Sequence, residues 1–216
     1  MVCYLYQQVE NSQNTFDFLD CKLAEVHKRQ RFATPDLVDE RTLRRDLARR
    51  DAGYPMDPTS LPRKVLWRTR KPDPLEVLPW FIVNDRFRQM VERFEPGLHQ
   101  FIPVELYRHK NEPPIAEYYW FIVCQRAATI DPEQTTCVWS EGSQYWMNSV
   151  LDRTTMTFHQ IKDAKLVYSA RLAANRHIWV DPTVPTHADR LCSEEFAQAA
   201  RDANFRGLGV VGRETC

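Results

Sequence analysis

A helical pattern of hydrophobic positions marks the most regular part of the chain, between residues 85 and 95. Its apolar residues recur at intervals of three and four, which places them on one face of an α-helix. These residues are Phe87, Met90, Val91 and Phe94. Asn84 precedes them as an N-cap, and Pro96 with Gly97 follows as a stop, because this pair does not continue a helix. The sequence therefore predicts an amphipathic helix from Asp85 to Glu95.

Two extended patterns follow this helix. The first alternates, and its apolar residues, which share one face of a strand, are Leu98, Ile102, Val104 and Leu106. Pro103 lacks an amide hydrogen, so we expect this strand at a sheet edge or at a bulge. The second, AEYYWFIVC at 116–124, is apolar at successive positions, which is typical of a strand buried on both faces. We expect it in the middle of the sheet.

Shorter patterns add elements elsewhere in the chain. Strand composition, rich in β-branched and aromatic residues, occurs at 2–9, 15–19, 165–169 and 176–180. We expect the first two to pair as a hairpin. Thr34 and Pro35 form an N-cap and first turn for a surface helix that continues to residue 51. The proline-containing segments 53–62 and 71–79 are predicted to be connecting loops.

The C-terminal region predicts one more helix and one more strand. Ser193 can cap the helix, whose inner face carries Phe196, Ala199, Ala200 and Ala203. The glycines of GLGVVG at 207–212 then turn the chain into a last short strand. Together these elements predict an α+β fold, in which mixed or antiparallel sheets carry a few amphipathic helices. We expect residues 62–216 to form the main domain, with residues 1–61 as a strand and helix region packed on it.

Composition places the chain among globular proteins and limits its partners. Its 216 residues are 43% hydrophobic and 12% aromatic, enough to fill a substantial core. The 29 basic residues balance 29 acidic ones, so no overall field favours nucleic acid or an anionic membrane. The N-terminus has no secretory signal pattern and the chain no apolar run of about 18 residues, so we expect a cytoplasmic protein without membrane contact. The six scattered cysteines are expected to be free and mostly buried.

The chain carries no local signature of catalysis or of a bound cofactor. Its six histidines stand apart, without the HExxH, CxxC or Asp-x-Asp spacing that gathers metal ligands on one element. No GxSxG or GxxxxGK[ST] motif occurs, and GLGVVG has no helix after it to receive a phosphate. We therefore expect no metal, no cofactor and no enzyme activity. A hydrolase stays an alternative, with a site that distant residues such as cysteine and histidine would assemble.

A basic stretch could contact nucleic acid. RKVLWRTRK at 63–71 places Trp67 among five cations, a pattern that can stack on bases and hold phosphates. The other interpretation is a strand formed by Val65, Leu66 and Trp67 and flanked by solvated charges. The neutral overall charge favours the strand.

A long polar segment at 129–148 could contact a protein. It combines acidic and aromatic side chains, and protein interfaces enrich aromatic residues at their centres. We therefore predict partner-binding residues here: Asp131, Glu133, Trp139, Glu141, Tyr145 and Trp146. The alternative is that the tryptophans are core residues of a strand pair.

The order of the elements resembles a known family. PWFIVNDRFRQMVERFEPGLHQFIPVEL precedes EYYWFIVCQRAATID, RHIWVD and LCSEEFAQAARDANFRGLGV, and this succession resembles the bacterial polymorphic-toxin immunity proteins of immunity family eleven. The matching positions are Val83–Asp85, Pro96–Gly97, His99–Phe101, Tyr118–Tyr119, Ile130–Asp131, Ile178–Trp179 and Ser193–Phe196. The resemblance covers about residues 62–212. Cys124 and Val180 depart from it, since the family pattern has asparagine and arginine there.

The resemblance implies a cytoplasmic α+β protein that binds and neutralises a toxin delivered by neighbouring or sister cells. Its partner would be this cognate protein toxin, encoded beside it, and inhibition would be stoichiometric, with no catalytic residues. The protein would plug the active cleft of the toxin or bind a remote face. A nucleic-acid or regulatory binding module that uses residues 63–71 is the alternative from a different class.

Overall fold

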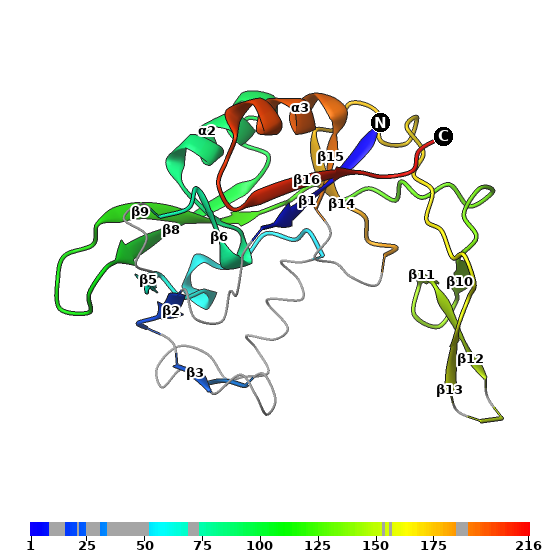
Figure 1. Cartoon of the computed structure of the whole chain (residues 1–216), viewed down its shortest axis with the longest axis horizontal. Helices are drawn as coiled ribbons and strands as arrows, with labels where there is room; N and C mark the ends of the chain where they lie inside the picture. The colour runs from blue at the N-terminus through cyan, green and yellow to red at the C-terminus, as the bar shows by residue number, and fades with distance from the viewer. Residues whose placement is uncertain are drawn as a thin grey trace.

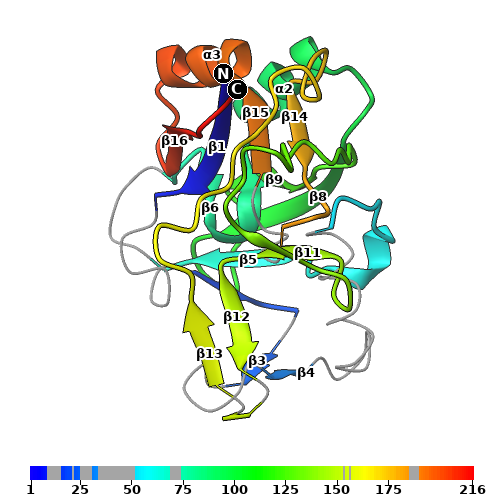
Figure 2. The same ribbon diagram turned by 90° about the vertical axis from the view of Figure 1, so that its right-hand side faces the viewer.

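The structure, a computed structural model, describes residues 1–8, 16–20, 22–24, 31–33, 52–68, 74–152, 154–155, 157–184 and 190–216. Across these residues, two larger sheets and two α-helices form the body of the molecule, and three two-stranded hairpins complete it (Figure 1, Figure 2). The fold is of the α+β class, which confirms the prediction. The surface helix expected from Thr34 to residue 51 lies outside the described residues.

The four-stranded sheet brings the two ends of the chain together. Its strand order is β14 (Ile178–Val180), β15 (Arg190–Ser193), β1 (Val2–Gln7) and β16 (Leu208–Gly212). All neighbouring strands are antiparallel, and Cys3 lies opposite Cys192 in β15 and Gly212 in β16. The predicted strand at 2–9 is thus confirmed over residues 2–7. Its hairpin with 15–19 was wrong, because both neighbours of β1 come from the C-terminal part of the chain.

The six-stranded sheet holds the central patterns of the sequence. Its strand order is β2 (Phe16–Phe18), β5 (Lys64–Trp67), β8 (Gln100–Tyr107), β9 (Ala116–Ile122), β7 (Ile82–Val83) and β6 (Val77–Leu78). Strands β5 and β8 are parallel, and the other neighbours are antiparallel. The apolar strand β9 lies inside the sheet, as predicted. The segment 71–79, expected to be a loop, contains the short strand β6.

Pro103 lies inside the sheet, so its expected place at an edge or bulge was wrong. Strand β8 runs between β5 and β9. The amide of Glu105 donates to the carbonyl of Arg63 at 2.8 Å, so alternate amides of β8 face β5. The backbone nitrogen of Pro103, two residues earlier, therefore also faces β5. The ladder with β5 begins only where Lys64 meets Glu105, so the missing amide of Pro103 costs no sheet bond.

The two predicted α-helices that fall on described residues are confirmed with their caps. Helix α2 (Asp85–Phe94) begins after Asn84, whose Oδ1 accepts from the amide of Phe87 at 3.1 Å. Helix α3 (Glu194–Ala203) begins after Ser193, whose Oγ accepts from the amide of Phe196 at 3.1 Å. The two helices lie side by side on one face of the molecule (Figure 1, Figure 2). The short 3₁₀ turns are η2 (Pro58–Ser60) and η3 (Pro79–Phe81). No helix in the described ranges is long and apolar enough to cross a bilayer.

The hairpins lie outside the two larger sheets. They pair β3 (Lys22–Ala24) with β4 (Arg31–Ala33), β10 (Val138–Ser140) with β11 (Tyr145–Met147), and β12 (Ser149–Asp152) with β13 (Thr157–Gln160). The last two form an arm that projects from the body (Figure 1). The predicted strand at 165–169 was wrong, because Tyr168 makes only isolated bridges with Ile130 and Thr215.

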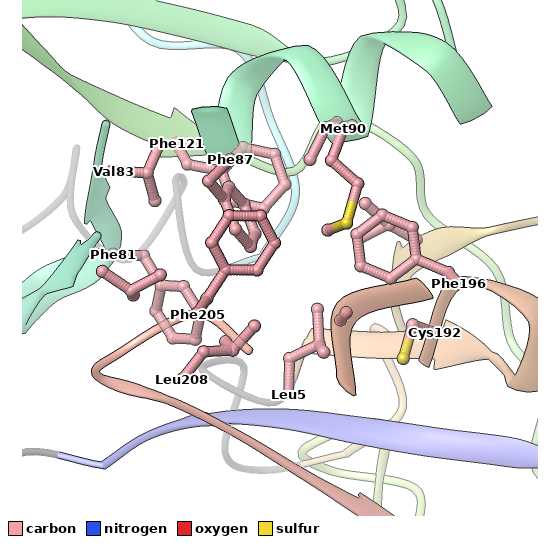
Figure 3. Packing of buried hydrophobic residues seen from close by; sticks show 14 of the residues in the cluster. Leu5, Phe81, Val83, Phe87, Met90, Phe121, Cys192, Phe196, Phe205 and Leu208 are labelled. Atoms are coloured by element: carbon pink, nitrogen blue, oxygen red, sulfur yellow. The ribbon is translucent and has the colours of Figure 1, made fainter. Parts of the chain in front are cut away.

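The main hydrophobic cluster fills the space between the two helices and the sheets (Figure 3). Phe87 of α2 and Phe196 of α3 are fully buried, and Phe87 makes edge-on contacts with Phe121 at 5.5 Å and Phe205 at 5.3 Å. A second cluster lies around Trp120 of β9. Leu98 is 41% exposed, so its expected place on the buried face of β8 was wrong. It lies in the turn before the strand begins.

A buried carboxylate joins α2 to both larger sheets. Glu95 and His99 are only 7% and 6% exposed, and Glu95 Oε2 lies 2.5 Å from His99 Nε2. The amide of Cys124 donates to His99 Nδ1, so Nε2 carries the hydrogen and donates to Glu95. Glu95 also accepts from the amides of His177 and Ile178, at 2.7 and 3.1 Å. Burial alone would raise the pKa of Glu95, but these hydrogen bonds outweigh it and lower the pKa.

Candidate functional site

The cysteines and histidines are the side chains from which a catalytic or metal site could be assembled. Across the described residues no group of three or more metal-binding side chains is present. Burial raises the pKa of Cys124 and Cys192, and burial with the nearby Glu194 raises that of Cys3 to about 11. A raised pKa keeps a thiol protonated and weakly nucleophilic. The five described cysteines are free and three of them are buried, as predicted.

Trp67 lies in the protein interior and cannot stack on bases. Its side chain is 2% exposed, and Val65 and Leu66 beside it in β5 are also buried. The strand interpretation of residues 64–67 is therefore confirmed. The alternative nucleic-acid module therefore loses the aromatic side chain on which a base would stack, because Trp67 is buried.

Trp139 and Trp146 face each other across the hairpin of β10 and β11. Their ring centroids are 5.4 Å apart, with the ring planes at 61°. Both side chains are half-buried. The amide of Trp146 donates to the carbonyl of Thr183 at 2.9 Å, and its ring packs against the cluster around Trp179. The tryptophans thus belong to a strand pair, as the alternative held, yet both keep part of their surface in solvent.

Tyr145 and Glu141 extend this surface around the turn of the hairpin. Tyr145 is half-buried opposite Ser140, and Glu141 is exposed in the turn. The side-chain amide of Gln144 donates to the carbonyl of Glu141 at 2.8 Å and approaches its carboxylate at 3.3 Å. The turn is therefore held by its own side chains and presents Glu141 in a defined place.

Asp131 and Glu133 lie earlier in the same segment and differ in their roles. Asp131 Oδ1 accepts from the amides of Glu133 and Gln134, which forms a turn. Its Oδ2 accepts from the thiol of Cys216 at 3.2 Å. The bond from Cys216, followed by the backbone amides, lowers the pKa of Asp131. Asp131 mainly shapes the chain, whereas the exposed Glu133 can meet a partner directly.

A cavity of about 470 Å³ opens at the base of the hairpin, beside Trp146. Its walls combine apolar and polar side chains: Cys137, Trp146, Asn148, Ala164, Leu166, Tyr168, Val184, Gly212, Arg213 and Glu214. The carboxylate of Glu214 lies 2.7 Å from Lys165 Nζ. No sequence pattern marks this cavity, because its walls come from separate segments that only the fold brings together.

The outer hairpin of the arm carries the most exposed aromatic residue of the described chain. Phe158 in β13 is 65% exposed, and Val150 in β12 is 48% exposed. Asp152 Oδ1 accepts from the amide of Thr154 at 2.8 Å and so helps to form the connecting turn. Phe158 pairs with Leu151, the neighbour of Val150, so Phe158 and Val150 lie on opposite faces of the hairpin. No sequence pattern predicted an element over these residues.

The comparisons with known proteins identify one family. A search among curated proteins finds no match to the chain. A protein-family model described as Immunity protein family (Imm11) matches residues 20–211. This match extends the resemblance found at 62–212 toward the N-terminus. Because the matched region spans most of its 216 residues, the chain belongs to the Imm11 immunity protein family.

Proposed function

We propose that this protein binds a cognate bacterial toxin in the cytoplasm and neutralises it by occupation, without catalysis. The observation that carries the proposal is the family match over residues 20–211. The described thiols, protonated and mostly buried, are consistent with a binding role. A protector must act before damage accumulates, so we expect tight association and slow release.

The contact surface in this proposal is the hairpin of β10 and β11. Trp139 is its central anchor, because its ring is held edge-on by Trp146 yet is only half-buried. Tyr145 and Glu141 flank the anchor, and the exposed Glu133 lies earlier in the same segment. Large aromatic anchors surrounded by polar contacts dominate the binding energy of many interfaces, at about 2 kcal/mol or more each.

The projecting arm favours a toxin with a concave binding site. Protruding loops on other binding proteins insert into concave surfaces. Phe158, at 65% exposure, would then enter the toxin first. Inhibition follows directly if the concave surface is the active cleft. If it is a remote site, binding must favour an inactive conformation. Competition with a substrate analogue of the toxin separates these two routes.

Family membership leads us to expect the toxin gene beside this one, and its inactivated product tests the proposal. Replacing Trp139 with alanine is expected to weaken binding at least about 30-fold, which corresponds to about 2 kcal/mol. The matched control is Ile115→Ala, because Ile115 is 47% exposed and belongs to the connection between β8 and β9. That connection lies far from the arm (Figure 1). The control should bind like the unmodified protein.

A thermal melt accompanies each variant, because a half-buried tryptophan also contributes to stability. If Trp139→Ala unfolds, Glu141→Lys reverses a charge on the exposed turn and tests the same surface without touching the core. Unchanged binding by both folded variants would refute the contact surface. A toxin that never co-purifies with the unmodified chain would refute the function.

A further inference from the structure

The four-stranded sheet ends at β16, and within the described chain one side of this strand has no neighbour. The strand order places β1 on the other side (Figure 2). Strands at the edge of a sheet present unpaired amide and carbonyl groups, which form a template for another strand. The groups that β16 presents can be identified from its pairing with β1.

Two hydrogen bonds show which residue pairs of β1 and β16 are hydrogen-bonded to each other. The amide of Arg213 donates to the carbonyl of Val2, and the amide of Gln8 donates to the carbonyl of Gly207, both at 2.9 Å. Bonded and non-bonded positions alternate along an antiparallel pair. The bonded positions of β16 between these two ends are therefore Gly209 and Val211.

Val210 and Gly212 occupy the non-bonded positions, so their amides and carbonyls point away from β1. Across the described residues, no backbone hydrogen bond reaches these outward groups. At both ends of this edge, outward backbone groups already have hydrogen-bond partners. The amide of Leu208 donates to the carbonyl of Phe205 at 3.3 Å, and the carbonyl of Glu214 accepts from the amide of Tyr168 at 2.9 Å. A short window around Val210 and Gly212 stays open.

The open window lacks the features that protect natural sheet edges. Residues 208–212 include no proline and no charged side chain, and the pairing with β1 has no bulge. Val211 is 45% exposed on the face of the sheet opposite the helices. Within the part of the chain that the structure describes, no segment occupies this edge, which could therefore pair with another strand.

The open window of β16 adjoins the cavity beside Trp146, because Gly212 belongs to both. Gly212 belongs to one wall of the cavity, and Ala164 and Leu166 belong to another. The cavity thus lies where the segment before Tyr168 separates from the end of β16. At about 470 Å³ it is within the size range of binding sites, which is about 300–1,000 Å³.

We propose that β16 receives an extended segment of the toxin as a fifth strand, with one side chain of that segment inserted into the cavity. This inference rests on the proposed function. Backbone bonds to Val210 and Gly212 would supply affinity, and the cavity would supply specificity, as in other strand-addition complexes.

The walls of the cavity define the chemistry of the inserted side chain. Trp146, Leu166 and Val184 offer apolar contacts, so an aromatic or long aliphatic side chain fits. Trp146 also belongs to the hairpin of β10 and β11, so the two contact regions are continuous.

Hydrogen exchange of single amides tests this inference most directly. In the free protein, the amides of Val210 and Gly212 should exchange fast, while those of Gly209 and Val211 should exchange slowly as internal controls. Adding the inactivated toxin from the neighbouring gene should slow Val210 and Gly212 at least tenfold. Fast exchange at both positions in a proven complex would overturn the inference and leave the proposed function intact.

The free protein provides a second discriminating result. Protection of Val210 and Gly212 that disappears on dilution would show that a second copy occupies the edge. Protection that is independent of concentration would show that another part of the chain covers it. Either result overturns the inference.

Two substitutions complete the test. Val210→Pro removes an outward amide without removing a bond to β1, and should weaken toxin binding at least tenfold. Val211→Thr, which keeps the shape and the backbone of the strand, is the matched control and should bind within twofold of the unmodified protein. If Val210→Pro fails to fold, Ala164→Phe fills the cavity instead and should give the same loss. Unchanged binding by the folded variant would overturn the inference.

Discussion

Replacing Glu95 with alanine tests how the two sheets and helix α2 are joined. The substitution removes the shared acceptor of three buried donors: His99 Nε2 at 2.5 Å and the amides of His177 and Ile178 at 2.7 and 3.1 Å. These groups come from the turn before β8 and from the start of β14, so both sheets lose a contact with the end of α2. We expect a large loss of stability.

The magnitude follows from the donors left unpaired. Each buried donor without an acceptor costs about 1–3 kcal/mol, and Glu95 accepts from three such donors. Water that enters the vacated space would satisfy some of the donors, so the free energy of unfolding should fall by about 3–5 kcal/mol. For a chain of this size, that corresponds to a melting temperature lower by about 10 °C.

Chemical denaturation and a thermal melt measure this effect. Glu92→Ala is the matched control, because Glu92 accepts a single surface bond from the amide of Gly97 at 3.0 Å. It should cost less than about 1 kcal/mol. Glu95→Gln keeps one acceptor oxygen and should fall between the two. A Glu95→Ala variant as stable as the control would refute the joining role of this carboxylate.

Further predictions concern pH and packing. The pKa of Glu95 is lowered in the folded protein, so its contribution is present above its unfolded pKa of about 4.3 and is lost as pH falls through the lower folded pKa. Curves of unfolding free energy against pH for the unmodified protein and Glu95→Ala should therefore converge in acid, and parallel curves would contradict this. Gly207→Ala should lower stability by more than about 2 kcal/mol in the same denaturation assay, because Gly207 has φ +89° and an added Cβ would lie 2.1 Å from the carbonyl oxygen of Val77. Within the described residues the buried indole N–H of Trp67 has no hydrogen-bond partner, so Trp67→Phe loses no hydrogen bond and should lower the free energy of unfolding by about 1–2 kcal/mol through the smaller ring alone, and a loss above about 3 kcal/mol would contradict this. Phe158→Ala should leave the melting temperature unchanged within error, because Phe158 is 65% exposed.

The elements predictable from sequence were those with local signals. Asn84 and Ser193 cap their helices as expected, because a cap depends on residues within one helical turn. The apolar strand at 116–124 lies inside its sheet for a similar reason, since burial on both faces leaves an uninterrupted apolar run.

Strand partners were not predictable, because pairing depends on residues far apart in the chain. Strand β1 pairs with strands that begin at Arg190 and Leu208, and no local pattern marks that choice. Backbone conformation at the connection of β6 and β7 also gave no signal. Trp80 and Phe81 adopt φ values of 65° and 55°, which bulky residues rarely do.

The aromatic residues of the candidate site could be proposed from the sequence, whereas the cavity and the sheet edge beside them could not. Trp139 and Trp146 attracted interest through composition, and the structure brings them into contact. The cavity and the open edge of β16 depend on how separate segments converge, so only the folded chain shows them.

The central claim is that the protein protects by occupying a toxin, and a titration of toxin activity tests it most directly. Increasing amounts of the purified protein are added to a fixed amount of active toxin from the neighbouring gene, well above the dissociation constant. The account predicts a linear fall in activity that reaches zero at one molar equivalent. Complete inactivation by a small fraction of an equivalent, progressing with time, would show turnover and contradict the account.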